Sequence, residues 1–252
     1  MTATLIDIPA AGYRYIPGVF QYSSGVAALD GFQIERVELM RPVPLSAGFD
    51  FIERYLADAG VSLLAFCACE LRSPAQFTEA GFIAFNRHYV GTLERWGVMR
   101  GGANPVARSN VCPEQHKPAE PSFHAFCFAR PEPSARGSFV VAGSGEAEER
   151  GASYRERTVR FGDTSSAGMR EKAVFVLNRM ESRMAMMGKH WRDTSAVQVY
   201  TVFDPHPFMA DEIVRRGAAE HGLTWHFARP PVEGLEYEMD CRGVSVEYRV
   251  SV

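Results

Sequence analysis

The sequence lacks the motifs that usually hold organic cofactors, nucleotides or catalytic zinc. It contains no GxGxxG, GxxxxGKS, GxxxxGKT, HExxH or GxSxG pattern, and no CxxC or His-x3-His pair. We therefore expect a protein that needs neither a cofactor nor a metal ion.

An excess of basic charge and long apolar runs are also missing. The 252 residues carry 27 Lys and Arg against 30 Asp and Glu, a net charge of −3, which makes nucleic acid a poor partner. No run approaches the roughly 18 apolar residues that span a bilayer, and no signal peptide is visible. We expect a cytoplasmic protein without membrane contact, whose Cys67, Cys69 and Cys127 are reduced and buried.

The composition that remains is that of a globular chain, with 46% hydrophobic and 23% charged residues. Residues 129–138 read ARPEPSARGS, a mixture of proline, glycine, serine and charge that is typical of a linker. This segment predicts two domains, residues 1–130 and 131–252.

The apolar patterns of the two halves predict the same order of elements. In the first half we expect strands at 20–26, 35–39, 61–70, 108–112 and 123–129, and helices at 48–59 and 78–96. In the second half we expect strands at 138–142, 157–161, 196–203, 223–228 and 235–246, and helices at 167–187 and 209–221.

This order indicates an α+β fold, a tandem repeat of two ββαβαββ units, although a single α+β domain with chance similarity is the alternative. Two helices on one face would leave the other face of each sheet bare. We therefore expect sheets to pack on sheets in a homo-oligomer.

The segment between residues 104 and 130 carries the candidate chemistry. Arg108 follows a Pro-containing loop at the start of a strand, where its planar guanidinium can bind a carboxylate. His124 lies in an apolar strand, where a core or interface role is the alternative to catalysis.

Five short segments, in order, resemble the YjgF/Rid family of enamine and imine deaminases. They are YIPGV at 15–19, SSG at 23–25, FNRHY at 85–89, VARSNV at 106–111 and FHA at 123–125. The resemblance covers most of residues 13–129. In the second half only the order of elements resembles the family.

The resemblance implies a chorismate-mutase-like fold in a trimeric or pseudo-hexameric assembly, with active sites in clefts between neighbouring domains. It implies that Arg108 binds a substrate carboxylate. It also implies that Tyr15, the Gly25 backbone, Asn86 and Asn110 line the cleft.

This chain departs from the family at the acidic residue that positions water, because His124 stands in its place. Histidine can act as a general base near neutral pH, and Glu120 is the alternative base. The second half has Gly222 where the arginine would fall, and Asp240 near the acidic position. We therefore expect one type of site per chain, made mainly by the first domain.

Chain length and the segment ARSNVCP also resemble a narrower group, the deaminases of 2-aminomuconate and its chlorinated analogues in aromatic degradation. Such a substrate is an enamine with two carboxylates, and its hydrolysis to an oxo acid and ammonia requires no cofactor. A second cation would be needed for the second carboxylate. The candidates are Arg72, Arg87, His88, His116 and Lys117, each of which could equally be plain surface charge.

Two other functions compete with a deaminase. The first is a catalytically degenerate relative that binds a small carboxylate without turning it over, favoured by the loss of the acidic residue at His124. The second is an RNA-cleaving protein, which the acidic net charge disfavours.

Overall fold

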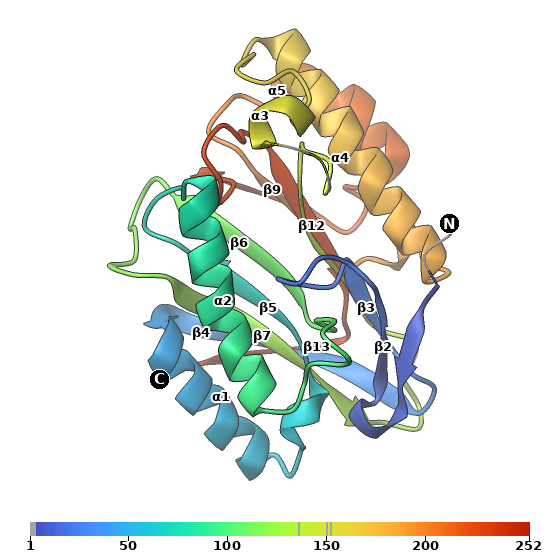
Figure 1. The fold of residues 1–252 in the computed structure, drawn as a ribbon. Helices are drawn as coiled ribbons and strands as arrows, with labels where there is room; N and C mark the ends of the chain where they lie inside the picture. The colour runs from blue at the N-terminus through green and yellow to red at the C-terminus, as the bar shows by residue number, and fades with distance from the viewer. Residues whose placement is uncertain (1–3, 136, 150, 152) are drawn as a thin grey trace.

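Two mixed β-sheets carry the fold (Figure 1). The structure is a computed structural model that describes residues 4–135, 137–149, 151 and 153–252. Among these residues, the six strands of sheet I are, in spatial order, β11 (Ala228–Arg229), β6 (Ala107–Pro113), β5 (Phe66–Arg72), β7 (Ser122–Pro131), β4 (Phe32–Pro44) and β13 (Val246–Val250). The seven strands of sheet II are β1 (Ile6–Ile8), β2 (Tyr13–Ile16), β3 (Gly25–Ala28), β8 (Phe139–Gly145), β12 (Glu238–Gly243), β9 (Ala196–Tyr200) and β10 (Leu223–His226).

Each sheet contains strands from both halves of the chain. The first three strands, β1 to β3, lie in sheet II beside β8, and the last strand, β13, pairs in parallel with β4 of sheet I. The predicted division into residues 1–130 and 131–252 therefore does not coincide with the sheets. A strand at 235–246 was predicted as one element, but the chain crosses from β12 in sheet II to β13 in sheet I.

Two helices cover the outer face of sheet I (Figure 1). Helix α1 (Leu45–Asp58) buries Phe49, Ile52 and Leu56, which are spaced three and four residues apart. Helix α2 (Glu79–Arg95) begins where the Thr78 hydroxyl accepts a hydrogen bond from the Gly81 N–H at 3.1 Å. Both predicted helices of the first half are confirmed.

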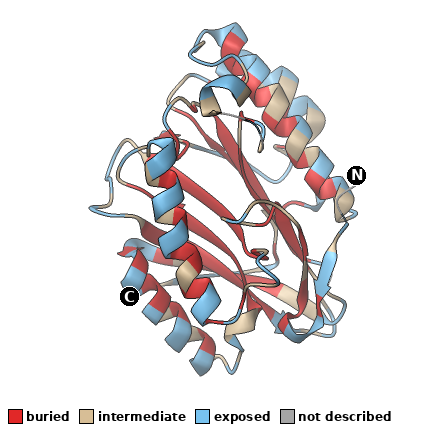
Figure 2. Cartoon of the chain, in the orientation of Figure 1, coloured by how far each residue is buried: buried red, intermediate tan, exposed pale blue. Residues whose placement is uncertain are grey.

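A long helix, α4 (Ser166–Met186), covers sheet II, and Ser165 caps its start. The remaining helical pieces are short: η1 (Pro9–Ala11), η2 (Leu63–Ala65), α3 (Tyr154–Arg157), η3 (Trp191–Asp193), α5 (His206–Phe208), the π-turn η4 (Met209–Ile213) and η5 (Val214–Arg216). The inner faces of the two sheets meet over a core that includes Tyr13, Tyr15, Ala107 and Ala142. Buried residues accordingly line the space between the layers (Figure 2).

Several predicted elements are wrong. The strand at 157–161 is the helical turn α3 and a following turn, because Ser153 and Glu156 form a capping box. The strand at 61–70 begins only at Phe66, since the Ser62 hydroxyl accepts from the Leu64 N–H and closes a 3-10 turn. The strand at 20–26 begins at Gly25, and the helix at 209–221 ends at Gly217 in a left-handed conformation.

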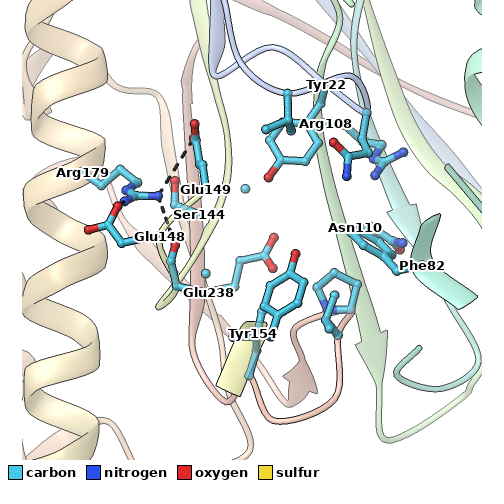
Figure 3. Close-up of a pocket in the computed structure, with 18 of the residues that line it drawn as sticks. Tyr22, Phe82, Arg108, Asn110, Ser144, Glu148, Glu149, Tyr154, Arg179 and Glu238 are labelled. Atoms are coloured by element: carbon cyan, nitrogen blue, oxygen red, sulfur yellow. Dashed lines mark hydrogen bonds and ion pairs between the residues drawn. The ribbon is translucent and has the colours of Figure 1, made fainter. Parts of the chain in front are cut away.

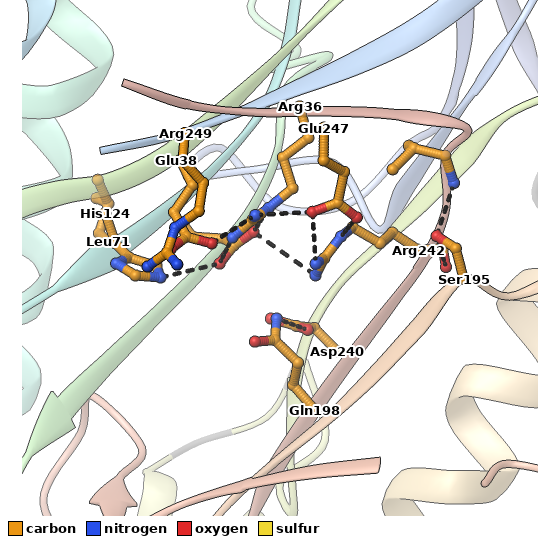
Figure 4. A network of polar contacts seen from close by, with 12 residues as sticks. Arg36, Glu38, Leu71, His124, Ser195, Gln198, Asp240, Arg242, Glu247 and Arg249 are labelled. Atoms are coloured by element: carbon orange, nitrogen blue, oxygen red, sulfur yellow. Dashed lines mark hydrogen bonds and ion pairs between the residues drawn. The ribbon is translucent and has the colours of Figure 1, made fainter. Parts of the chain in front are cut away.

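Sheet II covers part of the inner face of sheet I, and a charged network occupies much of the rest (Figure 4). The Arg36 guanidinium donates to both carboxylate oxygens of Glu70 at 2.6 and 3.0 Å, and also to Glu38 and Glu247. Arg242 of β12 lies 3.9 Å from Glu70 and donates to Glu247 at 3.0 Å. The network thus links both sheets. The trimer or hexamer expected from a bare sheet face stays a prediction.

We predict that Arg36→Met destabilises the fold by about 3–5 kcal/mol, because it leaves the Glu70 carboxylate buried without its bidentate partner. Arg249→Met is the matched control. Arg249 pairs with Glu38 at the same face, but its side chain is 74% exposed, so its loss should change stability by less than about 0.5 kcal/mol. Urea unfolding of both variants measures the difference, and equal effects would contradict the role given to the network.

Candidate active site

A cavity of about 90 Å³ lies where β6 and α2 of the first half face the second half of the chain (Figure 3). We call it the Arg108 pocket, after the residue that dominates one wall. Arg108 and Asn110 lie on one side of the cavity in Figure 3, and Arg179, Glu148 and Glu149 on the other, with Tyr22 and Tyr154 between them.

Arg108 is held by aromatic rings and an amide. It is 3% exposed, and its Nη2 donates to Asn86 Oδ1 at 2.6 Å. Its guanidinium carbon lies 4.7 Å from the ring centroid of Tyr89 and 5.5 Å from that of Phe85. Such rings stabilise a cation without neutralising it. Within the described residues, no carboxylate forms an ion pair with Arg108, so its charge is available.

Three buried N–H donors around Arg108 have no hydrogen-bond partner: Arg108 Nη1, Asn86 Nδ2 and Asn110 Nδ2. The orientation of both amides follows from their oxygens. Asn86 Oδ1 accepts from Arg108, and Asn110 Oδ1 accepts from the Ser73 hydroxyl at 2.9 Å. A buried donor without a partner costs about 1–3 kcal/mol, so a cluster of three is expected to bind an anionic group.

Glu238 of β12 brings a carboxyl group to the same pocket from the second half. The side chain packs on Gly143, where an added Cβ would come within 2.1 Å of Glu238 Oε1. Burial, together with the nearby Asp240 and Glu146 carboxylates, raises the pKa of Glu238 well above its usual range, although Arg108 opposes the shift. Because its pKa is raised, Glu238 is suited to act as a general acid.

The far wall of the pocket holds a rigid group of ion pairs. Arg183 donates to Ser144 Oγ and Glu149 Oε1, each at 2.5 Å, and Arg179 donates to Glu148 Oε2 at 2.6 Å. Burial raises the pKa of Glu149, but the charge and hydrogen bond of Arg183, together with Arg179 and the Ser24 hydroxyl, outweigh it, and the net pKa is lowered. Both arginines are thus largely neutralised by their glutamates.

The structure brings together only some of the residues predicted from sequence. Arg108, Asn86 and Asn110 form one cluster. Tyr15 lies in the core between the sheets, and Gly25 packs against the Val140 carbonyl and Met187, away from the pocket.

The two predicted bases do not lie in the pocket. Glu120 is exposed in the loop before β7. In the register of β5 and β6, Arg108 lies opposite Cys69. The Cys69 sulfur contacts the Tyr89 hydroxyl of α2, so both side chains lie on the outer face of sheet I. His124 instead lies 3.9 Å from Glu70 on the inner face. Side chains alternate between the faces of a strand, so Arg108 and His124 point to opposite sides of the sheet.

His124 is also poorly suited to accept a proton where it stands. Burial, followed by the charge of Arg72, lowers the pKa of His124 to about 3. The expected Arg108–His124 pair in one cleft is therefore corrected. The acid that faces Arg108 is Glu238, from a strand about 130 residues further along the chain.

None of the cations suggested for a second carboxylate lines the pocket. Arg72 is buried on the inner face of sheet I, 5.6 Å from the ring centroid of Tyr200. The other four, Arg87, His88, His116 and Lys117, are exposed. Sequence reasoning missed the residues that do line it, namely Tyr22, Tyr154, Arg157, Arg179, Arg183 and Glu238. Of these residues, only Glu238 is indicated by a pattern in the sequence, the alternation of the acids Glu236, Glu238 and Asp240.

We predict that Glu238→Gln stabilises the protein relative to the wild type, and increasingly so as pH rises. A carboxyl group whose folded pKa lies above its unfolded pKa binds more protons when folded, so its contribution to stability falls as pH rises between the two values. Glutamine does not titrate. Thermal unfolding between pH 5 and 9 measures the effect, with the exposed Glu233→Gln as control. A parallel pH dependence in wild type and Glu238→Gln would contradict it.

Within the described ranges, no three or more His, Cys, Asp or Glu side chains are grouped so that they could hold a metal ion. No described helix is both long and apolar enough to cross a membrane.

Fold and site together define an α+β protein of two mixed sheets with a pocket where β6 and α2 face the second half of the chain. The fold resembles that of a chorismatase, with a TM-score of 0.52 and 11% identity over 88% of this chain and 77% of that one. A family model described as 2-aminomuconate deaminase CnbZ matches residues 5–248. A 2-amino-5-chloromuconate deaminase of Comamonas testosteroni is 52% identical over 234 residues, covering 92% of this chain and 93% of that protein. The chain therefore belongs to the 2-aminomuconate deaminase CnbZ family and is an enzyme that acts on a carbon–nitrogen bond.

Proposed function

We propose that this enzyme hydrolyses an enamine carboxylate of the 2-aminomuconate type to an oxo acid and ammonia, without a cofactor. The family membership and the relative from Comamonas testosteroni support the class of substrate. The observation that carries the proposal is that Glu238, a buried acid with a raised pKa, lies opposite three free donors at Arg108, Asn86 and Asn110.

The three unpartnered donors would orient the substrate by binding its carboxylate. A carboxylate placed against Arg108 Nη1 and the two amide nitrogens would satisfy all three unpartnered groups. The enamine carbons next to that carboxylate would then face Glu238. Binding of the carboxylate at Arg108 therefore orients the reacting atoms toward Glu238.

Glu238 then serves as acid and base in turn. Its proton passes to the enamine carbon, and the C=C–NH2 unit becomes an iminium. The Glu238 carboxylate takes a proton from water as the oxygen attacks the iminium carbon. Glu238 then gives its proton to the carbinolamine nitrogen and takes the hydroxyl proton as the C–N bond breaks, so that the products are the ketone and ammonia. One water is consumed, and the enzyme ends in its starting protonation state.

We predict that Arg108→Ala lowers kcat/KM for ammonia release from 2-aminomuconate by about 100-fold or more, because it removes the buried cation that holds the carboxylate. Arg87→Ala is the matched control, since Arg87 follows Asn86 on α2 but is exposed. A variant at Arg108 that kept full kcat/KM would overturn the site assignment. Ligand-induced thermal stabilisation without turnover in the wild type would favour a carboxylate-binding protein.

A comparison of Glu238→Gln with His124→Asn separates the two candidate acid–base groups. If Glu238 acts first as an acid, Glu238→Gln abolishes turnover, while wild-type kcat falls at alkaline pH as Glu238 loses its proton. Activity that survives Glu238→Gln and is lost in His124→Asn would assign the role to His124. Circular dichroism of both variants checks that the fold is kept.

A further inference from the structure

A second cationic group lies in the far wall of the Arg108 pocket. Among the three arginines there, Arg179 and Arg183 are engaged with Glu148 and Glu149 as described above. Arg157 differs from both, because no carboxylate within the described residues forms an ion pair with it.

Arg157 is held in place and still has a donor to spare. Its Nη1 donates to the backbone carbonyl of Glu148, and its guanidinium stacks on Tyr154 at 3.7 Å. Its Nε is buried and has no partner. The capping box of Ser153 and Glu156 fixes the turn, and backbone bonds from Glu148 to Arg157 and from Val159 to Glu146 fasten it to the neighbouring loop.

That loop is itself anchored to the core. Lys172 and Glu146 form an ion pair at 3.1 Å in which both side chains are fully buried. The second oxygen of Glu146 accepts from the Tyr237 N–H at 3.1 Å, one residue before Glu238. Arg157 is therefore fixed relative to Glu238 and is not a mobile surface arginine.

The pocket between the two cations has an apolar lining. Phe82, Val232 and Leu235 lie along it. A ligand with an anion at each end and a flat hydrocarbon between them matches this order of cation, apolar wall and cation. A ligand with one anion would leave the charge of Arg157 without a counter-charge.

We propose that Arg157 binds the second carboxylate of a dicarboxylate substrate and so determines specificity for dicarboxylates over monocarboxylates. This proposal rests on the proposed function for the orientation of the first carboxylate at Arg108. It deepens that function by assigning the other end of the substrate to the turn α3.

The test measures binding rather than turnover. The dicarboxylate muconate and the monocarboxylate sorbate share a six-carbon diene and differ by one carboxylate. Calorimetric titration gives Kd for each with the wild type, Arg157→Gln, Arg157→Lys and Arg155→Gln. Arg155 is the control, an exposed arginine of the same turn that stacks on Phe161 outside the pocket.

We expect Arg157→Gln to weaken muconate binding by about 10- to 100-fold, the loss of a charge-assisted contact, and sorbate binding by less than about threefold. Arg157→Lys should restore part of the muconate affinity, and Arg155→Gln should change neither ligand. Equal weakening of both ligands would show a structural role for Arg157 and overturn the proposal, as would muconate binding that does not change.

Failure of the deaminase proposal has a different signature. In that case the wild type releases no ammonia from 2-aminomuconate, yet the muconate-to-sorbate ratio still depends on Arg157. Arg108→Gln provides the internal check, because it should weaken muconate and sorbate alike. Wild-type protein that binds neither ligand would overturn the assignment of Arg157.

Discussion

The ion pair between Arg36 and Glu70 fixes the inner face of sheet I, and the arrangement of the two sheets depends on it. The pair is bidentate and buried, and through Arg242 and Glu247 it extends to β12 and β13. Strand β12 carries Glu238 into the pocket. A charge network that orders the junction of two sheets therefore also sets the position of the acid relative to Arg108.

The exchange of strands between the sheets has a functional consequence. The first half supplies Arg108 and Asn110 to the pocket, and the second half supplies Glu238 and the far wall. Gly222 in the second half offers no counterpart to Arg108, and His124 in the first half points away from the pocket. Each half thus contributes side chains to the pocket that the other half does not.

Several groups of the site lower the stability of the folded protein. Three buried donors without partners and a carboxyl group whose pKa burial raises are all unfavourable in the free protein. They persist because the surrounding core is well packed, with Tyr89 and Leu93 of α2 on one side and Tyr237 on the other, all fully buried. A ligand that satisfied these groups would relieve part of this cost.

Local patterns in the sequence determined the helices α1, α2 and α4 and the α+β class, because spacing along one element decides which side chains share a face. The grouping of Arg108 with Asn86 and Asn110 came from the family resemblance, since these residues lie on two different elements. Sequence could not place Glu238 or Arg157 in the same pocket as Arg108, since only the tertiary structure brings β12 and α3 to β6. The sequence also suggested that Arg108 and His124 line one cleft, because the two strands that carry them follow each other in the chain. Only the tertiary structure showed that the two side chains leave opposite faces of sheet I, because face depends on the register of β5, β6 and β7 and on the bulges between them.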